Sequence, residues 1–377
     1  MSVAADKRDS QPAGLLAPST LVPVGAFCLG LVLLLLRANL DRMPVIAEIS
    51  LAVLIIALVF WTVFVVLEHA ETIAHRVGEP FGTLVLTLAV TAIEASVIVS
   101  VMLHGSPNPA IARESVFSTI MIVTAGVVGL CLVLGGLRHS QQEYKRLGTG
   151  ALLSVVIALS ALTLVLPNFT LAAAPGEFSA VQLAFVSLIC LLLYGAFVYR
   201  QMTRQRDDFV DAAPPPAEAE HVPAGHGLPV CFALLGVGLI GIVMLAEHVA
   251  AGLEGGLEAM HVGQVDAIVG AFIATLVLMP ETVAAIRAAT RNELQRSLNI
   301  ALGSACATIG LTVPVVATAS LITGHSLTLG LGAGDTVLLL LSLGISIVSF
   351  GQGRTTVMTG FVHLVVFIAY LLLIAVP

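Results

Sequence analysis

The sequence predicts an all-α polytopic membrane protein with about eleven transmembrane helices, arranged as one helix plus two inverted five-helix repeats. Three observations predict this fold class. Of the 377 residues, 58% are hydrophobic and only 10% are charged, and the mean hydropathy is +1.04, whereas soluble domains carry about 25% charged residues. Apolar runs long enough to cross a bilayer recur along the chain. One long polar segment divides them into a group of six and a group of five.

The individual spans follow from length, because a membrane-spanning helix needs about 20 apolar residues. The first and fifth runs are short and are expected to extend into their flanks. The first run lacks a cleavage motif, so we interpret it as a retained helix that follows a poorly ordered tail. The eleven predicted spans are 21–36, 44–67, 81–103, 116–137, 150–167, 178–199, 229–250, 264–286, 298–322, 334–350 and 356–376.

The polar break "QRDDFVDAAPPPAEAEHVPAGHG" sets the predicted domain organisation. We expect a cytoplasmic tail, a first transmembrane helix with its loop, a first five-helix repeat, an acidic linker and a second five-helix repeat. Their predicted bounds are 1–20, 21–43, 44–204, 205–228 and 229–377, in that order.

Positive charges predict the orientation, since Lys and Arg concentrate on the cytoplasmic side of a membrane. With the amino terminus in the cytoplasm, all Lys and Arg residues except Arg37, Arg42 and Arg113 fall on that side. The linker is then cytoplasmic and the carboxyl terminus lies outside. We expect an integral protein of the bacterial inner membrane.

An odd number of helices per group means that the second group enters the membrane opposite to the first. Inverted repeats of this kind are typical of secondary transporters. The sequence contains a matching internal similarity. Glu68-His69 near the end of the second span corresponds to Glu247-His248 near the end of the seventh, and "LVLTLAVTAIEAS" corresponds in type to "ATLVLMPETVAA". This correspondence aligns Glu94 with Glu281.

Glu94 and Glu281 are the strongest candidates for functional residues. Each lies deep in an apolar run, where a carboxylate is unfavourable by several kcal/mol on insertion scales and usually serves a function. The third span runs outward and the eighth runs inward, so the two carboxylates can approach each other near the membrane midplane. We therefore predict that the pair has the geometry that an ion site needs.

Other polar residues of these spans are candidate ligands. Thr87 and Thr91 share a helix face with Glu94, and their hydroxyls suit a hard cation; alternatively they bond to their own helix. Pro280 leaves the Leu276 carbonyl without its helical partner, which predicts a helix break that a cation could satisfy; the alternative is a simple kink.

The ninth span and two helix ends supply the remaining candidates. Asn299 and Ser304 could act as oxygen ligands, or Asn299 could form an interhelical hydrogen bond. Glu68 and Glu247 are predicted to line the access routes, where acids concentrate cations, or to be solvated helix ends. His363 is expected to be a packing residue.

These motifs resemble a known family. "GEPFGTLVLTLAVTAIEASVIVS" together with "LVLMPETVAAIRAATRNELQRSLNIALGSACATIGLTVPVV" is similar to the two alpha repeats of the cation/calcium exchanger superfamily, with the bacterial ChaA-type calcium/proton antiporters as the nearest branch. The resemblance implies that Glu94 and Glu281 bind the cation and exchange it for protons, and that Asn299 and Ser304 match polar positions of the following helix. Glu94 departs from the pattern because it lacks a Pro-Glu context.

The predicted function is calcium/proton antiport by alternating access. A sodium or potassium/proton antiporter of the same fold is the alternative, since the branch also contains such members. An intramembrane metalloenzyme is a remote alternative, because the chain has no H-E-x-x-H motif. We expect no enzyme activity and no cofactor besides the transported ion. The expected partners are cations, protons and the lipid bilayer, and the absence of a basic patch with interleaved aromatic residues disfavours nucleic acid.

Overall fold

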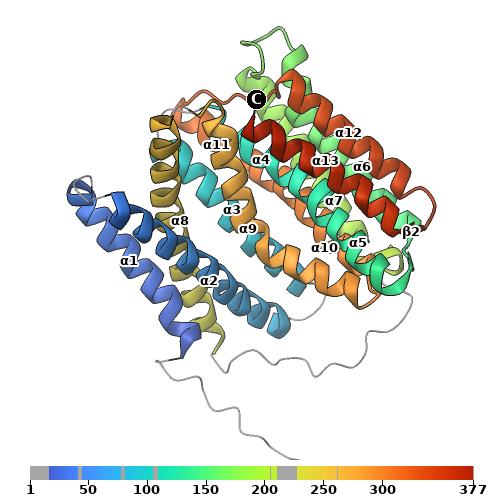
Figure 1. Ribbon diagram of the computed structural model, residues 1–377, viewed down its shortest axis with the longest axis horizontal. Helices are drawn as coiled ribbons and strands as arrows, with labels where there is room; N and C mark the ends of the chain where they lie inside the picture. Colours follow the sequence, from blue (N-terminus) through green and yellow to red (C-terminus); the bar gives the residue numbers. More distant parts are fainter. Residues whose placement is uncertain are drawn as a thin grey trace, which may run out of the picture. The chain divides into compact units, whose positions relative to one another are not determined.

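The computed structural model describes residues 17–40, 45–77, 81–104, 109–203, 205–209, 227–260 and 262–376 (Figure 1). Most of the predicted tail and most of the predicted linker lie outside these residues. Residues 18–20 of the predicted tail belong to the first helix. Within the described part, nine helical segments are long and apolar enough to cross a membrane, and two further apolar helices, in Thr87–Leu103 and Ala333–Ser349, are shorter. Together they give the eleven spans that the sequence predicts, which confirms the fold class.

The first six spans form the helix before the repeats and the first repeat. Two of these six spans, the fourth and the fifth, are each built from several helical pieces. The elements are α1 (Pro18–Leu40), α2 (Val45–Val77), α3 (Phe81–His104), α4 (Ile111–Met121) with η1 (Ile122–Val127) and α5 (Val128–His139), α6 (Arg146–Ser160) with η2 (Ala161–Val165) and η3 (Leu166–Phe169), and α7 (Ala180–Met202).

The second repeat supplies the remaining five spans, of which only the ninth is built from several pieces. A short 3₁₀ turn, η4 (Arg206–Phe209), precedes them at the start of the linker. The elements are α8 (Leu228–Ala259), α9 (Val265–Thr290), α10 (Leu294–Ala307) with η5 (Thr308–Thr312) and α11 (Val313–Thr323), α12 (Ala333–Ser349) and α13 (Val357–Ala375).

The structure differs from the sequence prediction in two local respects. Helices α2 and α8 continue well beyond the predicted ends of their spans, since the polar residues that end an apolar run do not end a helix. Pro280 lies inside α9, which continues as one helix from Val265 to Thr290. The predicted helix break is therefore wrong for this structure; a proline removes only one N–H donor, and the long flanking helical segments maintain the helix on both sides.

The chain forms two compact units that cut across the two repeats. Unit 1 contains residues 1–89 and 218–246, and unit 2 contains residues 90–217 and 247–377. In unit 1, α1 packs along α2 and closely against α8. At this contact Gly241 of α8 meets the backbone of Ala26 and Phe27, so a side chain larger than hydrogen has no room there.

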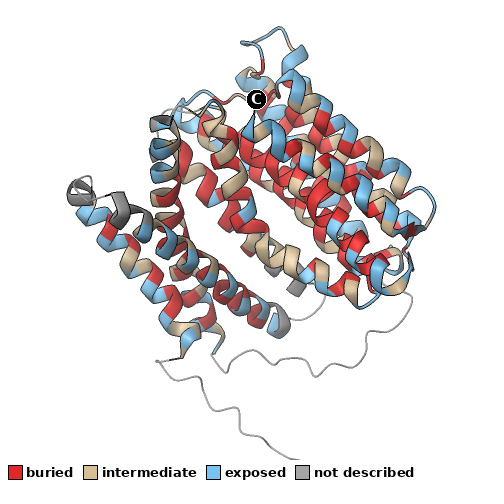
Figure 2. Cartoon of the chain, viewed as in Figure 1, coloured by how far each residue is buried: buried red, intermediate tan, exposed pale blue. Residues whose placement is uncertain are grey.

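Unit 2 holds the larger core. The fourth and ninth spans are mostly buried, whereas α7 and α13 expose most of their surface (Figure 2). Helix α9 packs along α4 and α10, and α13 packs along α5 (Figure 1). The spans that contain α4 and α10 thus form the centre of this unit, and α9 contacts both helices.

Two strand pairings join the repeats crosswise within unit 2. The short strand β1 (Gln141–Glu143) follows α5 of the first repeat and pairs antiparallel with β2 (Arg354–Thr356), which precedes α13 of the second, with Gln142 opposite Thr355. Conversely, Glu177 before α7 forms an antiparallel bridge with Thr328, after α11. Each repeat therefore uses its third–fourth connection to bind the fourth–fifth connection of the other, as a two-fold relation between repeats requires.

Candidate cation site

The Glu94 carboxylate lies at the centre of unit 2 and is held by hydroxyl groups. Its residue is 3% exposed. Thr308 Oγ1 donates to Oε2 at 2.6 Å, and longer contacts come from Thr119 Oγ1 to Oε1 at 3.3 Å and from Thr312 Oγ1 to Oε2 at 3.5 Å. The hydrogen bond from Thr308 is the shortest of the three and is therefore the strongest. No positively charged side chain is among these three partners.

The three hydroxyls come from the spans that directly follow the two carboxylate spans. Thr119 lies on α4 of the first repeat, and Thr308 and Thr312 lie at the two ends of η5 in the second. Threonines in membrane helices commonly bond back to the carbonyl four residues earlier, as Thr124 and Thr318 do here. The hydroxyls of Thr119 and Thr308 are instead directed to a buried carboxylate, which is typical of a built polar site.

π-Helical turns interrupt both of these spans. η1 directly follows α4, and η5 directly follows α10. Single π-helical turns within α-helices are often found at functional sites, because they redirect side chains and loosen the regular hydrogen-bond ladder. Thr308 and Thr312 lie within such a turn, and both reach Glu94.

Glu281 provides the second carboxylate, on α9. Its residue is only partly buried, but its Oε2 atom is buried and has no hydrogen-bond partner among the described residues. A buried carboxylate oxygen without a donor is rare in native proteins and requires an explanation; a proton or a bound cation would supply one.

Two sequence candidates on α10 lie in different surroundings from Glu94. Both ends of the Asn299 amide form hydrogen bonds: Oδ1 accepts from Gln295 Nε2 at 2.7 Å, and Nδ2 donates to the Phe209 carbonyl at 2.5 Å. Ser304 is partly exposed. The structure thus brings Asn299 to the start of the linker, and the ligand roles of Asn299 and Ser304 stay predictions.

The remaining candidates lie on α2, α3 and α8. Thr91 is buried and Thr87 is partly exposed, one turn apart on the helix that carries Glu94. Glu68 is exposed on α2. Glu247 is partly buried on α8, where its Oε2 accepts a hydrogen bond from Ser100 at 2.6 Å. Their predicted roles as ligand and access residues are consistent with these positions and stay predictions.

Sequence reasoning did not identify Thr119, Thr308 and Thr312. The Thr308–Thr312 spacing, one helical turn on the span after Glu281, is a signal that could have pointed to two of them. Thr119 directly follows Ser118, whose hydroxyl accepts instead from Tyr370 at 2.7 Å. His363 matches its prediction as a packing residue: it is 1% exposed, and its ring nitrogens contact the Thr124 carbonyl and the Ser349 hydroxyl.

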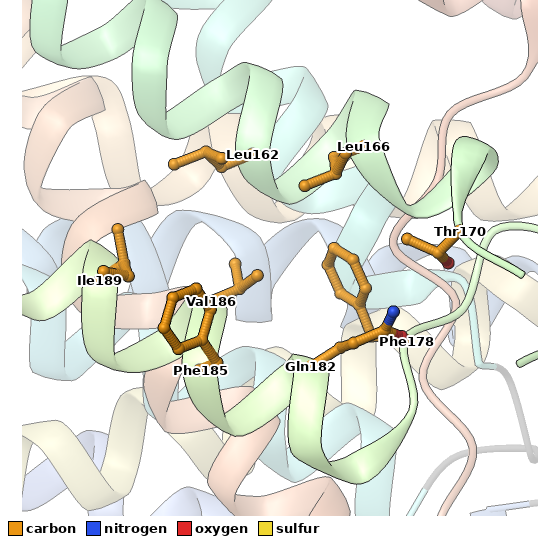
Figure 3. A pocket seen from close by; sticks show the side chains of 8 residues that line it. All are labelled: Leu162, Leu166, Thr170, Phe178, Gln182, Phe185, Val186 and Ile189. Carbon is orange, nitrogen blue, oxygen red and sulfur yellow. The ribbon is translucent and has the colours of Figure 1, made fainter. Parts of the chain in front are cut away.

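The described part of the chain also contains a cavity of about 160 Å³ beside α7 (Figure 3). Leu162, Phe185 and Ile189 are typical of its lining, which is almost wholly apolar, and Thr170 and Gln182 are its polar residues. A lining of this chemistry does not suit a cation. We therefore assign the candidate site to Glu94 and Glu281 rather than to this cavity.

Comparison with known proteins identifies the family of the chain. The model of the family described as sodium/calcium exchanger protein matches the chain twice, over residues 47–203 and 230–376. A protein of Sinorhizobium fredii named as an ionic transporter, y4hA, is 44% identical over 321 residues, which are 84% of this chain and 86% of the relative.

A second relative is the sodium-potassium/proton antiporter ChaA of Escherichia coli, which is 36% identical over 352 residues, 92% of this chain and 94% of the relative. Among solved structures, the H⁺/Ca²⁺ exchanger CAX matches with a TM-score of 0.66 at 16% identity, over 94% of this chain and 88% of that chain. This structural likeness shows the fold. By its two family matches and its antiporter relative, the chain belongs to the sodium/calcium exchanger family and is a cation antiporter of the ChaA-type branch.

Proposed function

We propose that this antiporter exchanges calcium for protons and that Glu94 and Glu281 carry both substrates. The observation that carries the proposal is the buried, unpartnered Oε2 of Glu281. The buried carboxylate of Glu94, which accepts hydrogen bonds from three threonine hydroxyls, supports it. Carboxylate and hydroxyl oxygens are the ligands that calcium prefers. A pair of carboxylates also matches the charge of a divalent ion.

The pair can enforce exchange by electrostatics alone. Two carboxylates that share a dry site resist being charged together. The site is neutral when both carboxyl groups are protonated and when both are ionised around one divalent cation. In either form the protein can therefore switch between its inward-facing and outward-facing states. The empty, doubly charged form is unfavourable, which prevents the protein from returning without a substrate.

A sodium or potassium/proton exchange is the second candidate. It is favoured by the name of the Escherichia coli relative, a sodium-potassium/proton antiporter that is 36% identical to this chain. The same carboxylates would then bind one monovalent ion while one of the two groups keeps its proton. Only the ion selectivity differs between the two candidates.

We further propose that the protein lies in the bacterial inner membrane with its amino terminus in the cytoplasm. The distribution of Lys and Arg supports this orientation. The two compact units are candidates for the parts that move against each other during alternating access.

The test uses proteoliposomes that contain a trapped pH dye. Calcium, sodium or potassium is added to wild type, Glu94→Gln, Glu281→Gln and the matched control Glu143→Gln, whose side chain is exposed and paired with Arg354. We expect calcium to drive proton movement in wild type and Glu143→Gln, and neither site variant to respond.

Each alternative outcome has a distinct meaning. A response to sodium or potassium but not to calcium would replace the first candidate with the second. Full activity in Glu94→Gln and Glu281→Gln would refute the role of the two carboxylates. Proton movement with none of the three ions would refute both candidates.

A further inference from the structure

The apolar cavity beside α7 lies between two neighbouring spans of unit 2 (Figure 3). Leu162 and Leu166 come from the end of the fifth span, and Phe185, Val186 and Ile189 come from α7. Val186 is 6% exposed, whereas Phe185 is 62% exposed. Because its lining includes both buried and exposed side chains, the cavity is a recess that is reached from the surface rather than a void enclosed in the core.

The surface from which this cavity is reached faces lipid. Helix α7 is long and apolar enough to cross a membrane. Its residues Val181, Phe185, Leu188 and Leu192 follow i, i+4, i+7, i+11 spacing, so they form one stripe of the helix, and all four are more than half exposed. Exposed apolar side chains on a membrane-spanning helix contact lipid tails, which are as apolar as leucine. The cavity is therefore continuous, through Phe185, with the face that α7 presents to the bilayer.

The wall opposite α7 is held in place by hydrogen bonds to the second repeat. The fifth span changes its winding here, since Leu162 lies in the π-helical turn η2 and Leu166 begins the 3₁₀ turn η3. The Leu331 N–H donates to the Leu164 carbonyl at 2.9 Å, and Asn168 Nδ2 donates to the Leu331 carbonyl at 2.6 Å. These two bonds lie on either side of Leu166 in the sequence. The wall is thus fixed by the protein itself, as expected of a preformed binding pocket.

The size and lining of the cavity suit an apolar occupant. Its volume is about 160 Å³, and an engineered cavity of about 150 Å³ lined by Leu, Ile and Phe in another protein stays dry and binds apolar molecules. If the cavity were empty, the side chains around it would lose dispersion contacts on one side. Because the cavity opens toward lipid, the apolar group that is always within reach is a hydrocarbon chain of a membrane lipid.

Polar residues mark one end of the cavity. Thr170 and Gln182 lie at this end, whereas leucine and isoleucine side chains line the other (Figure 3). Gln182 belongs to the first turn of α7, so the polar end lies at the boundary of the membrane span. The Ser179 N–H and hydroxyl donate to Gln182 Oε1 at 3.0 and 3.1 Å, which fixes the amide. Within the described part of the chain, Gln182 Nε2 donates to no acceptor.

We propose that this cavity binds one acyl chain of a membrane glycerophospholipid, with the ester end of that chain beside Gln182. The amide nitrogen of Gln182 can donate to an ester carbonyl, and the apolar end of the cavity receives the hydrocarbon. General contact with lipid gives no preference for this position, since the surrounding tails are equally apolar. The preference comes from filling the cavity and from the hydrogen bond at its end. The lipid site is separate from Glu94 and Glu281, and it does not rest on the proposed transport function.

The experiment measures lipid binding to the full-length protein in detergent by native mass spectrometry. The probe is dioleoyl phosphatidylcholine, titrated to give the dissociation constant of the first bound lipid. Val186→Phe fills the cavity from α7, and Leu162→Phe fills it from the opposite wall, so the test survives if one variant proves unstable by its thermal unfolding midpoint. Val181→Phe is the matched control, because Val181 lies on the same helix, is 80% exposed and is not part of the lining.

We expect Val186→Phe and Leu162→Phe to weaken binding of the first lipid by at least about tenfold, since many dispersion contacts are lost at once. Val181→Phe should bind as wild type does. Gln182→Glu keeps the oxygen acceptor for Ser179 but cannot donate, so it should weaken binding about fivefold, the factor that one ordinary hydrogen bond makes in an equilibrium. A dialkyl ether analogue of the probe, which lacks ester carbonyls, should bind wild type and Gln182→Glu equally.

Three results would overturn the lipid site. Equal dissociation constants for Val186→Phe, Leu162→Phe and Val181→Phe would show that the cavity does not hold the lipid. Unweakened binding of the ester lipid by Gln182→Glu would overturn the placement of the ester end. A dimer that Val186→Phe and Leu162→Phe abolish, with no lipid bound to wild type, would assign the cavity to a second copy of the chain. Binding is measured without transport, so each result holds whichever ion the protein exchanges.

Discussion

Replacing Thr308 with valine should weaken cation binding more than any other single hydroxyl removal at the site. Thr308 is 1% exposed and donates the shortest of the three hydrogen bonds to Glu94, at 2.6 Å, against 3.3 Å for Thr119 and 3.5 Å for Thr312. Valine has nearly the same shape, so the change removes the hydroxyl with little change in volume.

The magnitude follows from the partner of that hydroxyl. A hydrogen bond to a charged group contributes about 1.5–3 kcal/mol, which corresponds to roughly 10- to 150-fold in an equilibrium constant. We therefore expect Thr308→Val to raise the half-saturating cation concentration by at least about tenfold. Thr119→Val and Thr312→Val should each raise it by a smaller factor, because their bonds are long.

The assay is cation-driven proton flux in proteoliposomes at a series of cation concentrations. Thr318→Val is the matched control: this threonine lies on the same span, but its hydroxyl donates to the Pro314 carbonyl of its own helix. Thr308→Ser keeps the hydroxyl and should restore most of the affinity. If Thr308→Val and Thr318→Val had the same half-saturating concentration, the hydroxyl shell around Glu94 would not belong to the binding site.

Three further predictions concern stability, each measured as the midpoint of thermal unfolding in detergent. Gly270→Ala should destabilise the protein by about 1–3 kcal/mol through overpacking of α9 on α4, because the new Cβ would meet backbone atoms there, whereas Gly303→Ala has open space and should not. Asn168→Ala should lower stability by about 1 kcal/mol, since Asn168 donates to the Leu331 carbonyl at 2.6 Å; an unchanged midpoint would contradict this. Burial raises the pKa of the Tyr144 hydroxyl above its usual value of 10, so the folded state holds that proton longer than the unfolded state. The stability advantage of wild type over Tyr144→Phe should therefore be complete below about pH 10 and shrink above it. A difference in unfolding midpoint that does not change with pH would refute the raised pKa of Tyr144.

The fold could be predicted largely from the sequence, because the requirement for about 20 apolar residues per span is strict. All eleven predicted runs are helical in the described residues. The ends of α2 and α8 could not be predicted by this rule, which locates the edge of hydrocarbon rather than the end of a helix. The π-helical turns η1 and η5 were also missed, since an i+5 hydrogen bond has no residue signature comparable to that of proline or glycine.

The candidate site was predicted only in part. Glu94 and Glu281 are visible in the sequence because a carboxylate in an apolar run is conspicuous. Thr308 is inconspicuous, since a threonine hydroxyl in a membrane helix is normally satisfied by its own backbone. For Asn299 the residue type suggested an ion ligand. Only the fold reveals that its amide forms hydrogen bonds with the Phe209 carbonyl and the Gln295 side chain.

The crosswise pairing of the two repeats has a consequence for biosynthesis. Tyr144 in the first repeat and Gly353 in the second are joined by a hydrogen bond although 209 residues separate them. At about 5–20 residues per second of synthesis, the first repeat waits roughly 10–40 s for this partner. During that interval its loop at 141–144 has no strand to pair with. The first repeat therefore cannot complete its structure until the last two helices have been made. The two halves of the polypeptide depend on each other to reach their final structure.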